Sequence, residues 1–406
     1  MPSGKATSHD GATNPKAILG LLAASFAFLV LFTSSAVPIP LYSEYRVSIG
    51  LTDAAISIAM VSYLIGVCGV LFVAGSVSDA IGYRAAAVIG LLLGIGGCLL
   101  FSQVKSVPML FVARFCQGLS CGIAMSAISA WVVDVAKGRF LVVATTIAGC
   151  GALVGVMIGS ITIGVFCTVS SNYAIMYYIV AALMTLGIVF VLCAPEPPHA
   201  RVRLRAAIRP ITKIDPAILP VFPVAATAYL AAWIIGTYYQ SFSAIVALDC
   251  FGMAALDCFG MAAPIVGSCI LALSMAPSAF GGPVEARMRS GLSLRVSMVA
   301  LVATTALMCL FMALEQFAAF LLATGAFGMT TGMCLSGSLR LLLAKADGDT
   351  AHIVSTINLV GYVGCTIASL AMGASIDTLG LLGVLIALLI CGIGAAGIVF
   401  AKTKRA

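Results

Sequence analysis

One arginine stands inside a long apolar stretch, where a charge needs a chemical reason. Arg114 is the only charged residue of the run 108–133. A charged side chain within a membrane span is costly and marks a functional site by default. Its guanidinium could anchor an anionic group of a solute. Proton coupling could run through Arg114, Glu44 or His352. The alternative is that Arg114, near one end of its run, reaches out to the lipid headgroups.

A second set of charged residues falls in two short polar segments. Residues 75–84 read GSVSDAIGYR. Their two glycines permit a tight turn and close helix approach, and a carboxylate at Asp79 would be favoured by the positive end of a neighbouring helix dipole. Asp134, in the next segment on the same face, is expected to pair with Arg84. We therefore predict a conformational gate formed by Gly75, Asp79, Gly82, Arg84 and Asp134. The alternative for Asp79 is a simple helix cap.

Polar and aromatic side chains inside the apolar runs are the candidates for a solute cavity. Together with Gln117 they are Tyr63, Trp131, Trp233, Gln240, Asn358 and Tyr362. Asn358 and Tyr362 are four residues apart and share one helix face. The Asn358 amide is costly against lipid, so it contacts either a solute or a neighbouring helix. Tyr238 and Tyr239 are further candidates, but they lie near the outer end of their run, so of the two alternatives we favour their assignment to an interfacial aromatic belt.

Long apolar helices must position these residues. Of 406 residues, 62% are hydrophobic and only 9% are charged, and the mean hydropathy is +1.17. Soluble domains carry roughly 25% charged residues, so lipid must solvate the outer face of this chain. A span needs about 20 apolar residues. The sequence predicts an all-α integral membrane protein with spans near 17–40, 52–73, 85–103, 108–133, 140–166, 173–193, 218–246, 264–284, 292–313, 317–344, 352–375 and 380–401.

The basic residues predict an orientation. If the N-terminus is cytoplasmic, 18 of the 21 Lys and Arg lie in cytoplasmic segments, and only Arg46 and Lys105 lie in outer loops. Cytoplasmic segments carry an excess of Lys and Arg. We therefore expect a multi-pass protein of the inner or plasma membrane with both termini in the cytoplasm and no removable signal peptide.

A basic, proline-rich segment divides the chain into two equal sets of spans. Residues 194–216 hold five prolines among several arginines, which predicts a cytoplasmic linker. The expected domains are a six-helix bundle at 1–193, the linker, and a second six-helix bundle at 217–406. A tandem copy, ALDCFGMA, occupies 247–254 and 255–262. It is either a tolerated loop duplication or an acidic outer mouth formed by Asp249 and Asp257.

Small residues recur at helical spacing in the fifth span. Gly151, Gly155, Gly159 and Gly164 are spaced so as to allow close helix packing. In the second half, the segment 281–288 places Glu285 in a loop that echoes 75–84. No Asp or Glu falls clearly inside a span, which favours neutral, zwitterionic or anionic solutes.

Two motifs resemble those of the major facilitator superfamily. The pattern G-x-V-x-D-x-x-G-x-R at 75–84 is similar to its loop signature between spans two and three, and R-x-x-Q-G at 114–118 resembles its span-four motif. The resemblance implies two six-helix bundles with a solute site between them, and a role for Arg114 in proton coupling or substrate transfer. Ser160 stands where the drug–proton antiporters of the family usually carry a proline, so the chain departs from that pattern.

Three functional hypotheses follow. A secondary transporter working by alternating access is favoured. The family resemblance implies export of a drug or metabolite, driven by an ion gradient, ahead of uptake by a symporter or uniporter. An intramembrane enzyme would need clustered His, Asp or Glu, whereas the three histidines are scattered and no nucleotide-binding G-x-x-x-x-G-K-[ST] loop occurs. A channel or non-transporting receptor on the same scaffold is the third. We expect a monomer that binds a small solute, membrane lipid and protons, but no metal, cofactor or nucleic acid.

Overall fold

The computed structural model describes residues 15–74, 80–136, 140–196, 218–252, 263–288, 290–345 and 350–403. The first helices are α1 (Pro15–Ala36), α2 (Tyr42–Ile49), α3 (Asp53–Ala74), α5 (Tyr83–Ser102), α6 (Val107–Ile123), η1 (Ala124–Ile128), α7 (Ser129–Asp134), α8 (Phe140–Val169) and α9 (Ala174–Cys193). They are followed by α11 (Phe222–Ile245), η2 (Val246–Cys250), α13 (Ala263–Met275), α14 (Ser278–Ala286), α15 (Ser290–Ala313), α16 (Phe317–Leu343) and α17 (Thr350–Thr403).

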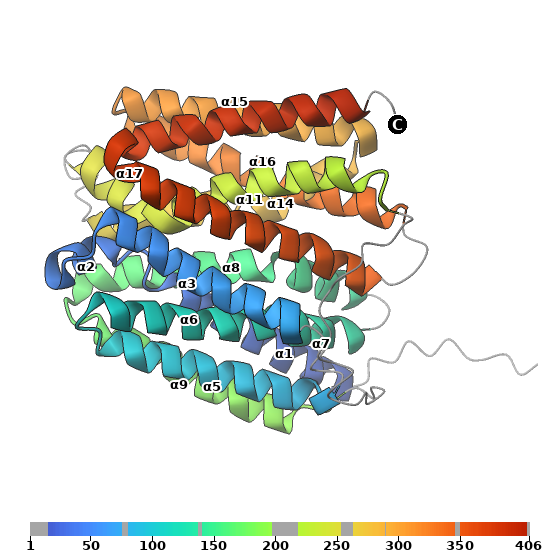
Figure 1. The fold of residues 1–406 in the computed structure, drawn as a ribbon. Helices are drawn as coiled ribbons and strands as arrows, with labels where there is room; N and C mark the ends of the chain where they lie inside the picture. The colour runs from blue at the N-terminus through green and yellow to red at the C-terminus, as the bar shows by residue number, and fades with distance from the viewer. Residues whose placement is uncertain are drawn as a thin grey trace, which may run out of the picture.

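Eleven helical stretches within these residues are long and apolar enough to cross a membrane. The last of them turns back at Gly380, whose φ of 67° is left-handed and breaks the helix. Its two arms form an antiparallel hairpin and both extend from this turn towards the same end of the molecule (Figure 1). With the arms counted separately, the described residues hold twelve crossings, which confirms the predicted all-α membrane fold.

Several crossings contain irregular turns that the apolar pattern hides. The π-helical turn η1 joins α6 and α7 into one crossing, Val107–Asp134. The crossing Pro264–Ala286 is interrupted between α13 and α14, where Pro277 precedes the new helix. A short helix, α2, follows α1 and was not expected from the sequence. Such breaks occur where backbone groups are buried in protein rather than exposed to lipid.

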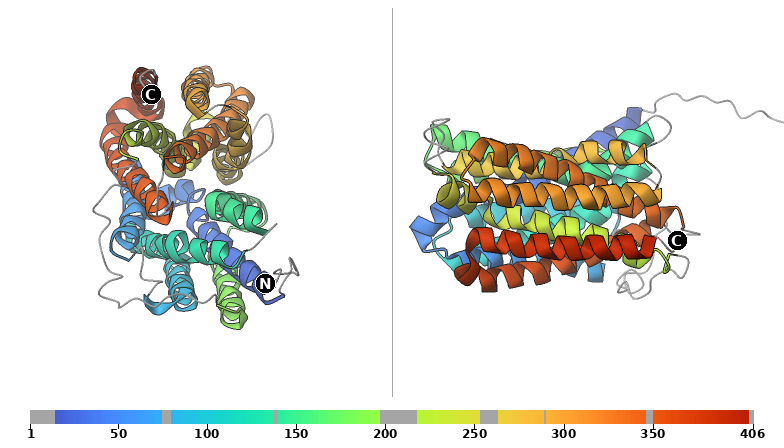
Figure 2. Two further views of the ribbon diagram at one scale, coloured as in Figure 1. Left: turned by 90° about the vertical axis from the view of Figure 1, so that its right-hand side faces the viewer. Right: turned by 90° about the horizontal axis from the view of Figure 1, so that it is seen from above.

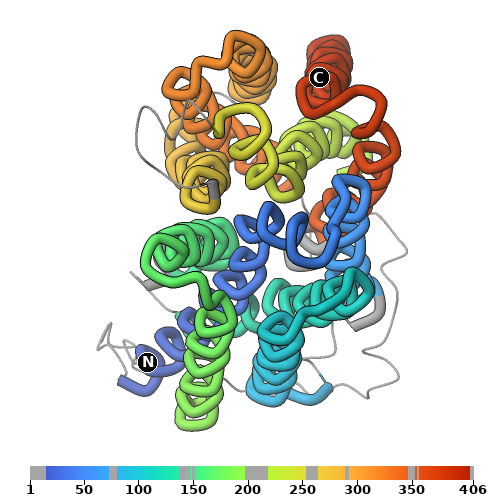
Figure 3. The backbone as a smooth tube through the Cα atoms, turned by 90° about the vertical axis from the view of Figure 1, so that its left-hand side faces the viewer, coloured from blue at the N-terminus to red at the C-terminus, as the bar shows by residue number. Residues whose placement is uncertain are grey.

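The helices lie in two groups. Viewed end-on, the helices from α1 to α9 lie on one side and those from α11 to α17 on the other (Figure 3). The groups touch mainly through α3 against α17 and α8 against α13. We call the end of the bundle that carries α2 the α2 end (Figure 1). The opposite end, where both chain ends lie, is the termini end (Figure 2).

The predicted glycines of the fifth span sit at close helix contacts. A Cβ on Gly155 would lie 2.6 Å from Cβ of Phe32, and one on Gly151 would lie 3.0 Å from the Phe28 ring. A Cβ on Gly159 would meet the carbonyl of Thr33. These three glycines therefore let α8 pack closely on α1, whereas Gly164 faces Ser268 of α13 and serves the contact between the groups.

Candidate functional site

Arg114 is enclosed within the first group of helices. Its side chain is only 1% exposed, so the alternative that it reaches the headgroups is wrong. The Nε atom donates to the Tyr42 hydroxyl at 2.7 Å, and Nη1 donates to the Ser35 carbonyl at 2.7 Å and to Oε1 of Gln117 at 3.2 Å. The guanidinium also lies over the Tyr42 ring, 5.2 Å from its centroid.

The charge of Arg114 is balanced by dipoles and rings instead of a carboxylate. Among the described residues no Asp or Glu forms an ion pair with it, and its Nη2 atom is buried with no hydrogen-bond partner. A buried cation without a counter-charge is energetically expensive. The electrostatic energy of such a group depends strongly on any charge brought near it.

Gln117 and Gly118 hold three helices together beside Arg114. The Gln117 amide donates to the Ser34 carbonyl at 2.9 Å, which ties α6 to α1. A Cβ on Gly118 would meet the backbone carbonyl of Tyr63, so only glycine permits this approach of α6 to α3. The R-x-x-Q-G spacing therefore anchors the arginine and fixes the position of Tyr63.

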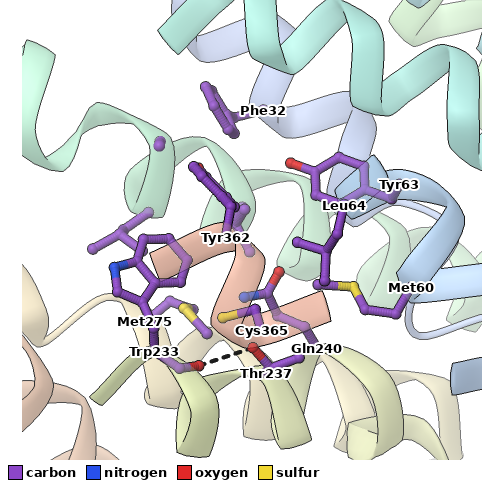
Figure 4. Close-up of a pocket in the computed structure, with 13 residues that line it drawn as sticks. Phe32, Met60, Tyr63, Leu64, Trp233, Thr237, Gln240, Met275, Tyr362 and Cys365 are labelled. Atoms are coloured by element: carbon purple, nitrogen blue, oxygen red, sulfur yellow. Dashed lines mark hydrogen bonds between the residues drawn. The ribbon is translucent and has the colours of Figure 1, made fainter. Parts of the chain in front are cut away.

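A small cavity lies between the two groups of helices (Figure 4). Its volume is about 30 Å³, which is room for water only. The first group contributes Phe32, Met60, Tyr63, Leu64, Ala152, Leu153 and Val156, and the second group contributes Trp233, Thr237, Gln240, Met275, Tyr362 and Cys365. This cavity is therefore lined by four of the residues predicted to line a solute cavity, namely Tyr63, Trp233, Gln240 and Tyr362.

Two other candidates lie elsewhere. Trp131 is fully buried and stacks on Tyr83, with ring centroids 6.5 Å apart and an interplanar angle of 13°. Asn358 accepts a hydrogen bond of 2.5 Å from the Tyr229 hydroxyl, so of its two expected roles the structure shows the contact between helices.

The assignment of Tyr238 and Tyr239 to an interfacial belt is wrong. Both side chains are fully buried. The Tyr238 hydroxyl donates to the Leu381 carbonyl at 3.1 Å, and the Tyr239 hydroxyl contacts the sulfur of Met308 at 3.2 Å. Since η2 extends the crossing of α11 to Cys250, the two tyrosines lie deeper than the sequence suggested.

The two groups are joined at the α2 end by an ion network. Nη1 of Arg46 on α2 lies 2.8 Å from Oδ2 of Asp249 on η2, and its Nη2 lies 3.3 Å from Asp53 at the start of α3. Burial acts to lower the pKa of Arg46, but the hydrogen bond to Asp249 and the charge of Asp53 outweigh it and the pKa is raised. The guanidinium therefore stays charged. Sequence reasoning missed this pair, although it had singled out Asp249 within the duplicated segment.

Small residues complete the closure at the α2 end. The Ser160 hydroxyl on α8 donates to the Ser268 carbonyl on α13 at 3.0 Å. A Cβ on Gly373 of α17 would lie 2.6 Å from that of Ser57 on α3. The bundle is therefore packed shut between its groups at this end.

Part of the predicted gate at the termini end is described. The pairing of Asp134 with Arg84 is wrong in this conformation: Asp134 accepts from the Tyr83 hydroxyl at 2.6 Å, while Arg84 donates to the Ala194 carbonyl at 2.6 Å. These contacts lie within the first group. Gly82 precedes α5 with a φ of 93°, so a residue with a side chain would be strained there. Gly75 and Asp79 lie outside the described residues, as do residues 197–216 of the linker and the second ALDCFGMA copy.

A buried carboxylate in the second group corrects one expectation. Glu285 lies in the last turn of α14, not in a loop, and is 1% exposed. It pairs with Arg340 of α16 at 2.7 Å and accepts from the Ser293 hydroxyl at 2.6 Å. The carboxylate lies at the end of the crossing Pro264–Ala286, where it holds α14, α15 and α16 together.

The fold and the cavity define a polytopic helical membrane protein with a small cavity at the interface between two helix groups. The sequence profile of the Major Facilitator Superfamily matches residues 24–369. The chain belongs to this family of membrane transporters. None of the curated proteins matches the chain.

Proposed function

We propose that this chain is a secondary active transporter that exports a small solute by alternating access, driven by an ion gradient. The supporting observation is the cavity shared by both helix groups, closed at the α2 end by contacts that cross from one group to the other. A solute site at the interface of two groups can open to either side when they rock against each other. The moving units are the predicted domains, 1–193 and 217–406, linked by 194–216.

The orientation follows from charge. With the termini end in the cytoplasm of a cell inner or plasma membrane, the basic segments lie inside. The α2 end then faces outward, and the described conformation is closed to the outside. The protein acts as a monomer in the lipid bilayer.

Arg114 is the residue to which we assign coupling. Its guanidinium is buried, lacks a carboxylate partner in the described part of the chain and has one unpartnered nitrogen. Gln117 holds it in place. A proton or an anionic group arriving near this site would change its electrostatic energy strongly in a low-dielectric setting.

The inner gate consists of Gly75, Asp79, Gly82, Arg84 and Asp134. The Asp79→Asn substitution is expected to impair transport without reducing membrane insertion, because it removes a charge that favours one conformer. Equal transport by mutant and parent would remove Asp79 from the gate.

The experiment that tests the proposed function is solute flux in proteoliposomes. Purified protein is reconstituted into liposomes, which are loaded with labelled solutes from a panel. Flux is measured with and without an imposed proton gradient in each direction. Ala152→Phe places a larger side chain in the cavity, whereas Leu92→Phe makes a matched change at a lipid-facing position. We expect saturable flux that Ala152→Phe abolishes and Leu92→Phe retains. Flux of no solute under any gradient would refute the proposal.

A further inference from the structure

The central cavity has an uncharged wall. None of the thirteen residues that line it is acidic or basic. Arg114 is not among them, and its hydrogen bonds point to Tyr42, Ser35 and Gln117. Transfer of an ionised group into such a space without a partner costs several kcal/mol or more. The wall therefore selects against solutes with a localised charge.

Aromatic rings reach the cavity from both helix groups. Phe32 and Tyr63 come from the first group, and Trp233 and Tyr362 come from the second, with the last two ring centroids 5.2 Å apart. In Figure 4 the Tyr63 and Tyr362 rings approach the same space from opposite helices. Flat aromatic solutes gain offset or edge-to-face contacts with such rings beyond simple burial.

One amide supplies directional polarity. The Gln240 side chain points into the space between Tyr362 and Leu64 (Figure 4), and no hydrogen bond within the described residues engages it. The neighbouring Thr237 hydroxyl is already used, because it donates to the Trp233 carbonyl at 2.8 Å. Gln240 offers both a donor and an acceptor to a ligand.

The cavity is far too small for an aromatic ring in this conformation. At about 30 Å³ it admits only water. A solute must therefore enter when the groups have moved apart, and its binding energy is then tied to that motion.

We infer that the transported solute is an uncharged aromatic molecule that carries at least one hydrogen-bonding group, held between Tyr63 of the first group and Trp233 and Tyr362 of the second, with its polar group on Gln240. This inference rests on the proposed function and names the substrate class of the same site. It narrows the neutral, zwitterionic and anionic classes allowed by the sequence to the neutral one.

The chain contains a natural reporter for this binding. It has two tryptophans: Trp233 lines the cavity, and Trp131 is buried against Tyr83. A Trp131→Phe variant leaves Trp233 as the only indole, and Trp233→Phe leaves only Trp131. The probes are 4-nitrobenzyl alcohol, 4-nitrobenzoate and 4-nitrobenzylamine, which share one quenching ring and carry no charge, a negative charge and a positive charge.

Saturable quenching of Trp233 by the alcohol is expected at concentrations at least about tenfold lower than those needed by either ion. In the Trp233→Phe variant the alcohol should give only the linear, unsaturable quenching caused by partitioning into lipid. Tightest saturable binding of either ion, or no saturable quenching by the alcohol, would overturn the substrate class.

A charge substitution gives a second, independent readout. Gln240→Glu should reverse the preference towards the amine, because a carboxylate in the cavity would pair with it. The matched control is Gln316→Glu on the exposed loop before α16, which should leave the preference unchanged. An unaltered order of affinities in Gln240→Glu would contradict the assignment of Gln240. The proposed function has its own test, and the two proposals fail in different ways. If only the substrate class is wrong, the liposomes still show saturable flux of another solute. If the proposed function is wrong, they show flux of no solute.

Discussion

The ion pair between Arg46 and Asp249 should set how often the α2 end opens. The Asp249→Asn substitution removes the carboxylate that joins the two helix groups at 2.8 Å. The two side chains are 31% and 39% exposed, so water and salt screen them. Pairs of this kind contribute about 0.2–1 kcal/mol. The ratio of open to closed molecules should therefore rise by about 1.4- to 5-fold.

Hydrogen–deuterium exchange with mass spectrometry, on protein in lipid nanodiscs, measures this shift without labels. The informative peptides cover α8 around Gly159–Gly164 and α13 around Ser268, where the groups touch away from the substituted residue. Their exchange in Asp249→Asn should accelerate by up to the same factor. The difference should shrink in 1 M salt, where the Debye length is about 3 Å.

A matched control separates the contact between groups from a contact within one group. Asp53 also binds Arg46, at 3.3 Å, but both residues belong to the first group. Asp53→Asn is therefore expected to leave exchange at α13 unchanged. Equal acceleration in the two variants, or none in Asp249→Asn, would refute the role of the Arg46–Asp249 ion pair in holding the α2 end closed.

Three further substitutions test other parts of the structure. Arg114→Lys should slow flux at least about tenfold while the protein still folds, because an ammonium cannot reproduce the forked hydrogen bonds of the guanidinium; wild-type flux in this variant would remove Arg114 from the coupling site. Glu285→Ala should lower stability by about 1–3 kcal/mol, since it leaves Arg340 without its carboxylate, and an unchanged melting temperature would contradict the buried pair. Gly159→Ala should lower the melting temperature, because the added Cβ collides with α1. Gly394→Ala should not, because a Cβ there meets no neighbouring atom within 4 Å. Equal melting temperatures of the two variants would count against the close contact of α8 with α1.

The sequence predicted the features that depend on local composition. Each crossing is a run of apolar residues long enough to span a bilayer, so hydropathy located them all, including the turn near Gly380. Arg114 was recognised because a charge in such a run is rare. Tyr63 and Trp233 were identified as cavity residues because polar or large aromatic groups within spans tend to face the interior.

Contacts between distant segments could not be read in the same way. Arg46 and Asp249 are separated by 203 residues, and no periodicity relates them. Residues 83 and 84 point in different directions from α5, because consecutive helical residues are rotated by about 100°. The Tyr83 hydroxyl therefore donates a hydrogen bond to Asp134, whereas the Arg84 guanidinium donates to the Ala194 carbonyl.

The misplacement of Glu285 has a specific physical cause. Gly281, Gly282 and Pro283 in succession are typical of a turn. In the structure a Cβ on Gly281 would meet the backbone of α16 near Met333. The glycine serves close packing of two helices, and the helix continues through the proline to Ala286.

The most direct test of alternating access is to lock the α2 end shut and measure flux. In a background without native cysteines, Arg46→Cys and Asp249→Cys replace the ion pair that joins the groups, and a short cleavable bis-thiosulfonate links them. Solute flux in proteoliposomes is then recorded before linking, after linking and after reduction. Flux should stop on linking and return on reduction, because the groups can no longer separate at that end. Undiminished flux through the linked protein would show that transport does not require this opening.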